Sequence, residues 1–324
     1  MLTDEAPHEV TDPIASTETA VSQVSKPVAR RGRPPRRRGF RIVVASDGSP
    51  QARVAIQAAI DFPWPANAEA LGVIARGGSH PQWSASAAAG IDTVVREIVG
   101  DTERALRRRW STASVVVDDA APVDAILRHA RGAGAIVVGS RGQSRLERWM
   151  VGSVSRGVVR QARTPVLVVK KRPRAFRHLV VAYDGSNHAR RALEMVASLK
   201  VPSRGRVTLL TVVDAIDPPS SVLLPGRLQR ILAREAKAFG QERMARAREK
   251  LQRAARPLVD AGWRVRVDVR AGVASRELVT VPAVIGADVL VIGAKGAGGW
   301  TRLMLGSVAE AILDRASVST LLVR

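Results

Sequence analysis

Apolar residues along this chain gather in short continuous runs, and most runs are followed by a stretch in which apolar positions have helical spacing. The runs are rich in Val, Ile and Leu and lack apolar–polar alternation, which is typical of strands buried on both faces of a parallel sheet. The alternation of strand and helix predicts an α/β fold. Strands are expected from 41 and at 70–75, 114–118, 135–138 and 165–170, and again from 178 and at 207–213, 265–270, 288–292 and 320–323.

The second half of the chain repeats the first. Segments 41–49 (RIVVASDGS) and 178–186 (HLVVAYDGS) both lead an apolar strand into Asp-Gly-Ser. Right-handed crossovers then give each copy a doubly wound, five-stranded parallel sheet with helices on both faces. We predict a first domain at 39–170, a linker at 171–177 and a second domain at 178–324. Helices are expected at 52–60, 91–110, from 122 and at 152–161, and in the second copy at 189–199, 228–259, from 275 and at 306–315.

Residues 1–38 lack hydrophobic periodicity and are rich in Thr, Ser, Pro and charge, so we predict a disordered tail. Its first 25 residues carry only acidic charge, and the remainder is basic. The compact cluster from Arg30 to Arg38 contains Arg-Gly-Arg-Pro at 31–34, which resembles the core of an AT-hook, a motif whose arginines enter the DNA minor groove. A DNA-associated tail and a solvated basic linker both remain open.

Composition narrows the chemistry. The chain has 324 residues, no cysteine and five histidines without metal-ligand spacing, so disulfides, thiolate nucleophiles and metal sites built from protein side chains are not expected. No apolar run approaches the roughly 18 residues of a membrane helix, and the N-terminus lacks a signal-peptide layout, so we expect a cytoplasmic protein without membrane contact. The net charge is +22, which favours anionic partners without specifying one.

Glycine-rich loops follow the fourth strand of each copy with identical spacing. The first copy reads Gly139-Ser-Arg-Gly142, nine residues, then Gly152-Ser-Val-Ser155; the second reads Gly293-Ala-Lys-Gly296, nine residues, then Gly306-Ser-Val-Ala309. Glycine permits positive φ and lets a ligand approach the backbone closely. The Gly-Ser pair opens a helix whose unpaired N–H groups attract anions, and the serine can cap that helix as well as bind phosphate. The loops predict a polyphosphate site.

Asp47 and Asp184 end the first strand of each copy. A carboxylate at this point can accept hydrogen bonds from an adenine edge or from ribose hydroxyls, although Asp-Gly-Ser also forms an Asx-turn before a helix. In open α/β sheets, ligands bind beyond the carboxyl ends of the strands, where the strand order reverses. Because the aspartates and the glycine loops both fall at this edge, we interpret the aspartates as ligand-binding residues.

With these motifs the chain resembles, over residues 40–324, a tandem universal stress protein of the ATP-binding type. The resemblance rests on the Gly-x-x-Gly-(nine)-Gly-Ser loops, the aspartates and the fifth-strand segment 164–169 (TPVLVV). It implies two Rossmann-like domains, similar to adenine nucleotide alpha hydrolases, each with strand order 3-2-1-4-5, and ATP with Mg²⁺ as cofactor. The ATP-binding residues that it implies are Ala45, Asp47, Val73, Gly139, Arg141, Gly142, Gly152, Ser153, Val154 and Ser155 in the first copy, and Ala182, Asp184, Val212, Gly293, Lys295, Gly296, Gly306, Ser307 and Val308 in the second.

Two departures distinguish the second copy. Ser155 matches a hydroxyl position that supports phosphate binding in the family, whereas the second copy has Ala309 there; it also has Ser319 in place of Pro165. These differences weaken the expectation of ATP binding for the second copy. The resemblance also implies that the fifth strands pair; with two copies in one chain this pairing is expected inside the molecule, and a homodimer remains open.

Sequence signatures of fast ATP-using enzymes are missing. The chain has neither a P-loop lysine motif nor the motif set of a protein kinase, and no metal clamp or positioned base is evident near the loops. We therefore expect a stress-response protein in which ATP occupancy shifts conformation or partners, with at most slow ATP hydrolysis. A slow ATPase and DNA association through the basic tail are the alternatives.

Overall fold

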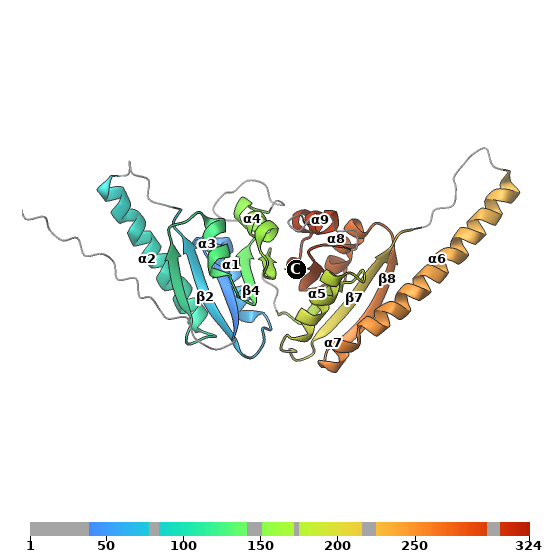
Figure 1. Ribbon diagram of the computed structural model, residues 1–324, viewed down its shortest axis with the longest axis horizontal. Helices are drawn as coiled ribbons and strands as arrows, with labels where there is room; N and C mark the ends of the chain where they lie inside the picture. The colour runs from blue at the N-terminus through green and yellow to red at the C-terminus, as the bar shows by residue number, and fades with distance from the viewer. Residues whose placement is uncertain (1–38, 78–83, 141–150, 172–174, 216–224, 297–304) are drawn as a thin grey trace, which may run out of the picture. The chain divides into compact units, whose positions relative to one another are not determined.

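The computed structural model describes residues 39–77, 84–140, 151–171, 175–215, 225–296 and 305–324 (Figure 1). The predicted tail at 1–38, with its AT-hook-like cluster, and the loop residues Arg141 and Gly142 lie outside the described residues. The first repeat consists of β1 (Phe40–Ala45), α1 (Pro50–Asp61), β2 (Ala68–Ala75), α2 (Ala85–Arg107), β3 (Ser114–Asp118), α3 (Pro122–His129), β4 (Ala135–Gly139), α4 (Ser153–Gln161) and β5 (Val166–Val169).

The second repeat follows the same order. It consists of β6 (His178–Ala182), α5 (Asn187–Ala197), β7 (Arg206–Val213), α6 (Gly226–Ala254), α7 (Arg256–Asp260), β8 (Arg264–Ala271), α8 (Ala274–Val284), β9 (Val289–Gly293), α9 (Ser307–Arg315) and β10 (Ser319–Val323). The single long helix expected at 228–259 is wrong, because the chain breaks at Ala255 into two helices. Pro257 is the second residue of α7, in the first turn, where the N–H that proline lacks has no intrahelical acceptor.

One ten-stranded sheet joins the two repeats, in the order β3-β2-β1-β4-β5-β10-β9-β6-β7-β8. Within each repeat all neighbouring strands are parallel, which confirms the α/β fold with strand order 3-2-1-4-5. At the centre, β5 and β10 pair antiparallel, with Leu167 opposite Leu321. The expected internal pairing of the fifth strands is therefore confirmed.

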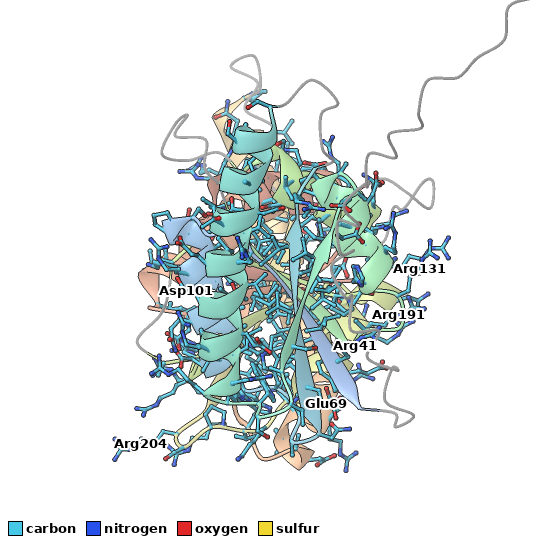
Figure 2. All side chains as sticks on the ribbon, turned by 90° about the vertical axis from the view of Figure 1, so that its left-hand side faces the viewer. Arg41, Glu69, Asp101, Arg131, Arg191 and Arg204 are labelled. Carbon is cyan, nitrogen blue, oxygen red and sulfur yellow. The ribbon has the colours of Figure 1, made fainter. Side chains whose placement is uncertain are left out.

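Alternate residues of the central strands face two separate cores. On β1, Ile42 and Val44 belong to the core under α1, α2, α5, α6 and α7, whereas Val43 belongs to the core under α3, α4, α8 and α9. Each core contains residues of both repeats, so the helices cover the sheet as two continuous layers. Charged side chains such as Asp101 and Arg131 point outward (Figure 2). None of the described helices is long and apolar enough to cross a membrane.

The residue that follows the fifth strand of each repeat caps the last helix of the other repeat. The Lys170 ammonium, just after β5, donates hydrogen bonds to the carbonyls of Leu313 and Ala316 at the end of α9, at 2.7 and 2.6 Å. Arg324, just after β10, donates from Nη2 to the carbonyls of Val159 and Arg160 at the end of α4, at 2.9 and 2.6 Å. A cation at a helix C-terminus satisfies carbonyls that have no intrahelical partner and complements the helix dipole.

Candidate functional site

Each repeat carries an Asx-turn where its first strand ends. In the first repeat the N–H of Ser49 donates to Asp47 Oδ1 at 3.0 Å, and the Ser49 hydroxyl accepts from the N–H of Ala52 at 3.1 Å. In the second repeat Ser186 makes the same two bonds, to Asp184 Oδ1 at 2.9 Å and from the N–H of Ala189 at 3.1 Å. The turn therefore uses one carboxylate oxygen of each aspartate. The two roles considered for these aspartates, an Asx-turn and ligand binding, are thus compatible, because the turn does not use the second carboxylate oxygen.

The turn glycines next to the two aspartates have positive φ. Among the described glycines of the site, Gly48 and Gly185 have φ of +75° and +82°, whereas the glycines of the loops after the fourth strands do not have positive φ. The loop glycines that the structure describes therefore do not use the positive φ that glycine permits. Glycine also lets other atoms approach the backbone closely, and this is tested by the space that a Cβ would have at each position.

A methyl group at Gly293 would overlap backbone. Its Cβ would lie 2.8 Å from the carbonyl carbon of His188 and 2.9 Å from the nitrogen of Ala189, at the start of α5. At Gly296 the nearest atom would be Asp184 Oδ2, at 3.0 Å. The first loop glycine therefore lets β9 pack against the N-terminus of α5, and the second lets the loop pass close to the aspartate.

We expect Gly293→Ala to lower the free energy of unfolding by about 1–3 kcal/mol, the usual cost of overpacking. The matched control is Gly306→Ala, because a Cβ at Gly306 would meet nothing nearer than 3.6 Å. Denaturant unfolding of both variants measures the difference. Equal stability of the two proteins would contradict the assignment of Gly293 to helix–strand packing.

The last glycine of each motif caps a helix. Gly152 and Gly306 are the N-caps of α4 and α9, in extended conformation, and neither helix has a side-chain capping bond. Ser153 and Ser307 are the first helical residues, so the expectation that they cap the helix is wrong. Both serines are exposed at the start of their helices. The first N–H groups of a helix have no intrahelical acceptor, so these termini present donors to a ligand.

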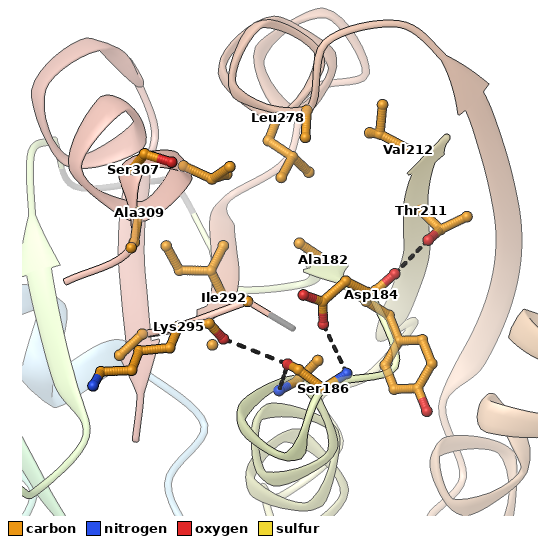
Figure 3. A pocket seen from close by; sticks show the side chains of 18 of the residues that line it. Ala182, Asp184, Ser186, Thr211, Val212, Leu278, Ile292, Lys295, Ser307 and Ala309 are labelled. Carbon is orange, nitrogen blue, oxygen red and sulfur yellow. Dashed lines mark hydrogen bonds between the residues drawn. The ribbon is translucent and has the colours of Figure 1, made fainter. Parts of the chain in front are cut away.

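A cavity of about 340 Å³ occupies this edge of the second repeat (Figure 3). All nine residues proposed for the second copy line it: Ala182, Asp184, Val212, Gly293, Lys295, Gly296, Gly306, Ser307 and Val308. Figure 3 shows Ser307 and Ala309 on α9 on one side of the cavity and Asp184 and Val212 on the other. The structure thus brings residues that are more than 100 positions apart in the sequence into one pocket.

The first repeat has an equivalent cavity of about 230 Å³. Eight of the residues proposed for the first copy line it: Ala45, Asp47, Val73, Gly139, Gly152, Ser153, Val154 and Ser155. The other two, Arg141 and Gly142, lie outside the described residues. The two cavities therefore occupy the same place in both repeats, between β1 or β6, the loop after the fourth strand and the N-terminus of the last helix.

Sequence reasoning missed one wall of each pocket. Pro122 and Ile126 of α3 line the first cavity, and Ala274 and Leu278 of α8 line the second. These helices begin just after the third strands, so their first turns also lie at the carboxyl edge of the sheet. The sequence predicted where each of these helices starts, but it gave no signal for the face of the sheet that each helix covers. The wall is apolar and suits the face of a flat ring better than a phosphate.

Ser155 holds the glycine loop of the first repeat. Its buried hydroxyl donates to the carbonyl of Gly139, the last residue of β4. The N–H of Gly152 donates to the Ser140 carbonyl at 2.7 Å, and the N–H of Gly306 donates to Ala294 at 3.1 Å in the second repeat. The loop is therefore closed by backbone in both repeats, and the hydroxyl adds a bond that Ala309 cannot make.

The second pocket lies in cationic surroundings. Burial lowers the pKa of His188, at the start of α5, and the nearby cations Arg191, Lys295 and Arg324 lower it further, against the opposing charge of Asp184. Burial is the largest cause of this shift, and the cations that add to it produce a positive field that would favour an anionic ligand. No group of His, Cys, Asp and Glu side chains suited to a metal ion occurs among the described residues.

Comparison with known proteins identifies the family. The model of the universal stress protein family matches residues 40–170 and 175–324. The chain belongs to the universal stress protein family. Universal stress protein Rv2005c of Mycobacterium tuberculosis is 32% identical over 208 residues, which cover 63% of this chain and 66% of that protein, just under two thirds of its length. Universal stress protein MJ0577 of Methanocaldococcus jannaschii is 23% identical over 154 residues, covering 46% of this chain and 95% of that protein.

Solved structures share the fold. The crystal structure of a universal stress protein from Archaeoglobus fulgidus has a TM-score of 0.60 at 20% identity and covers 88% of this chain and 98% of its own. The protein PA1789 of Pseudomonas aeruginosa has a TM-score of 0.50 at 15% identity and covers 88% of this chain and 92% of its own. At these identities the likeness shows the fold of the tandem pair and leaves the ligand to be argued from the pockets.

Proposed function

We propose that this universal stress protein binds ATP in both pockets and acts as a nucleotide-dependent stress-response protein. The observation that carries the proposal is the position of the two cavities. Each lies at the carboxyl edge of its sheet half, where the strand order reverses between the first and fourth strands, and each is bounded by a helix N-terminus.

The pocket walls divide into an apolar part and a polar part. Val73 and Ile126 in the first repeat, and Val212 and Leu278 in the second, supply apolar contacts for an adenine ring. The aspartate beside them has a carboxylate that can accept hydrogen bonds from the ring edge or the ribose. Phosphates would lie against the amides at the start of α4 and α9, where the helix dipole favours negative charge.

The described residues of both pockets include groups that can bind a nucleotide, but no histidine that could act as a general base. Among their described lining residues there is no histidine, and the only carboxylates are Asp47 and Asp184, each engaged in its Asx-turn. When bound, Mg²⁺ would neutralise phosphate charge. We therefore propose a binding function, in which occupancy changes the protein's conformation or partners, and at most slow hydrolysis of ATP.

The decisive measurement is the nucleotide content of the purified protein. The protein is denatured and the released nucleotide is quantified per chain, and protein freed of nucleotide is titrated with Mg-ATP by calorimetry. Two ATP per chain are expected. One per chain would restrict the proposal to a single repeat, and no binding in either assay would overturn it. Hydrolysis above that of a pocket-filled variant would instead favour the slow ATPase.

A further inference from the structure

The last helices of the two repeats carry opposite charges at equivalent positions. Counted from the Gly-Ser pair, Arg156 of α4 corresponds to Glu310 of α9, and Arg160 corresponds to Asp314. The two helices meet across the seam, where Arg156 Nη1 lies 3.4 Å from Glu310 Oε2 and Arg160 Nη2 lies 3.0 Å from Glu310 Oε1. Arg156 also pairs with Asp314.

One of the two acidic residues of this cluster, Glu310, lies beside the second pocket. Glu310 is in the first turn of α9, directly after Ser307, Val308 and Ala309, which line the cavity. A carboxylate there repels a polyphosphate that approaches the same helix N-terminus. The first repeat lacks this repulsion, because the residue equivalent to Glu310 is Arg156.

Partial burial makes the neutralisation of Glu310 effective. The side chains of Arg156 and Glu310 are 22% and 27% exposed, so solvent screens their interaction less than that of a fully exposed surface pair. Arg160 adds a second bond, from Nε to Glu310 Oε1 at 3.1 Å. Both arginines come from the other repeat, so the charge of Glu310 is balanced by residues outside its own domain.

We propose that Arg156 and Arg160 of the first repeat are positioning residues of the second repeat's nucleotide site: by neutralising Glu310 they preserve its affinity for a polyphosphate. The inference rests on the proposed function and adds a dependence of one site on the other repeat. It also gives a reason why equivalent positions of α4 and α9 carry opposite charges. Two copies that did not contact each other would not need this difference.

The second site can be observed separately, because Tyr183 is the only tyrosine of the chain and lines the second pocket. In the full-length protein labelled with 3-fluorotyrosine, the single ¹⁹F resonance is followed during titration with Mg-ATP. We expect Arg156→Gln combined with Arg160→Gln to raise the Kd at this site about five- to tenfold, within the usual range of coupling between sites. Adding Glu310→Gln should return the Kd to within about twofold of wild type, and high salt should reduce the difference.

Each outcome separates the two claims. Wild-type protein that shows no response to Mg-ATP and contains no nucleotide overturns the proposed function and this inference with it. Wild type that binds while the double variant binds equally well overturns the inference alone. A loss that Glu310→Gln fails to restore assigns the arginines to helix packing, which also overturns the charge argument; thermal unfolding of the same variants reports that packing directly.

Discussion

Gly306→Val is expected to remove nucleotide binding from the second repeat while the first repeat still binds. A Cβ at residue 306 would lie 3.6 Å from the Cα of Lys295 and 3.7 Å from the nitrogen of Gly296. It would therefore lie between the two glycine-containing segments of the second repeat, 293–296 and 306–309. The isopropyl group would therefore occupy the space assigned to the phosphates. Since a phosphate displaced from its amide donors loses charge-assisted hydrogen bonds of about 1.5–3 kcal/mol each, we expect a loss of affinity of roughly 100-fold or more.

The fold should tolerate this change. Gly306 has φ of −68° and ψ of 151°, which a valine adopts without strain, and α9 has no side-chain capping bond to lose. Calorimetry with Mg-ATP should find about one site per chain, and Gly152→Val should remove the other. Ser307→Ala is the matched comparison: it leaves the space empty and removes only a hydroxyl, so a smaller loss of affinity is expected than for Gly306→Val. Two sites of unchanged affinity in Gly306→Val would show that the phosphates do not lie between the loops.

Much of the fold follows from local patterns in the sequence. Strands β3 and β4 and the start of α3 lie where the apolar runs and Pro122 predict them, because a buried parallel strand is apolar throughout and proline favours the first turn of a helix. The repeat then predicts the same order of elements in both copies, right-handed crossovers predict a doubly wound sheet, and the strand order 3-2-1-4-5 follows from the family resemblance. The aspartates and the glycine loops could be predicted because they follow strands whose carboxyl ends lie at one edge of the sheet, whereas the apolar residues Ala45, Val73, Ala182 and Val212 were named from the family resemblance.

The features that escaped prediction depend on contacts between distant segments. The carbonyls of Ala59 and Val196 are equivalent in the two repeats, and a tryptophan Nε1 donates to each, at 2.8 and 3.2 Å. In the first repeat the donor is Trp64, which closely follows α1, whereas in the second it is Trp263, which precedes β8. No comparison of the two copies predicts this exchange, because the same space is filled from different parts of the chain. The ion pairs between α4 and α9 are likewise defined only once the two repeats meet.

Trp64→Ala is expected to cause a large loss of stability, about 3–5 kcal/mol, as for other buried aromatic side chains. Trp64 is fully buried, its ring centroid lies 4.3 Å from that of Phe62, and its Nε1 satisfies the Ala59 carbonyl near the end of α1. Phe62 in turn contacts Phe176, just before β6, at 5.1 Å. The cavity would therefore open within the core that both repeats share.

Two further variants separate the loss of ring packing from the loss of the hydrogen bond and control for an exposed site. Trp64→Phe keeps an aromatic ring but leaves the Ala59 carbonyl without its donor, and is expected to lose less than the alanine variant, with about 1–3 kcal/mol of its cost arising from the unsatisfied carbonyl. Val284→Ala, at a side chain that is 77% exposed, should change stability little. Because one core cluster holds residues of both repeats, from Ile42 to Val323, unfolding of the alanine variant should remain a single transition shifted to lower denaturant. Two separate transitions would show instead that each repeat is stable without the core at the seam, and that the shared sheet joins domains which fold independently.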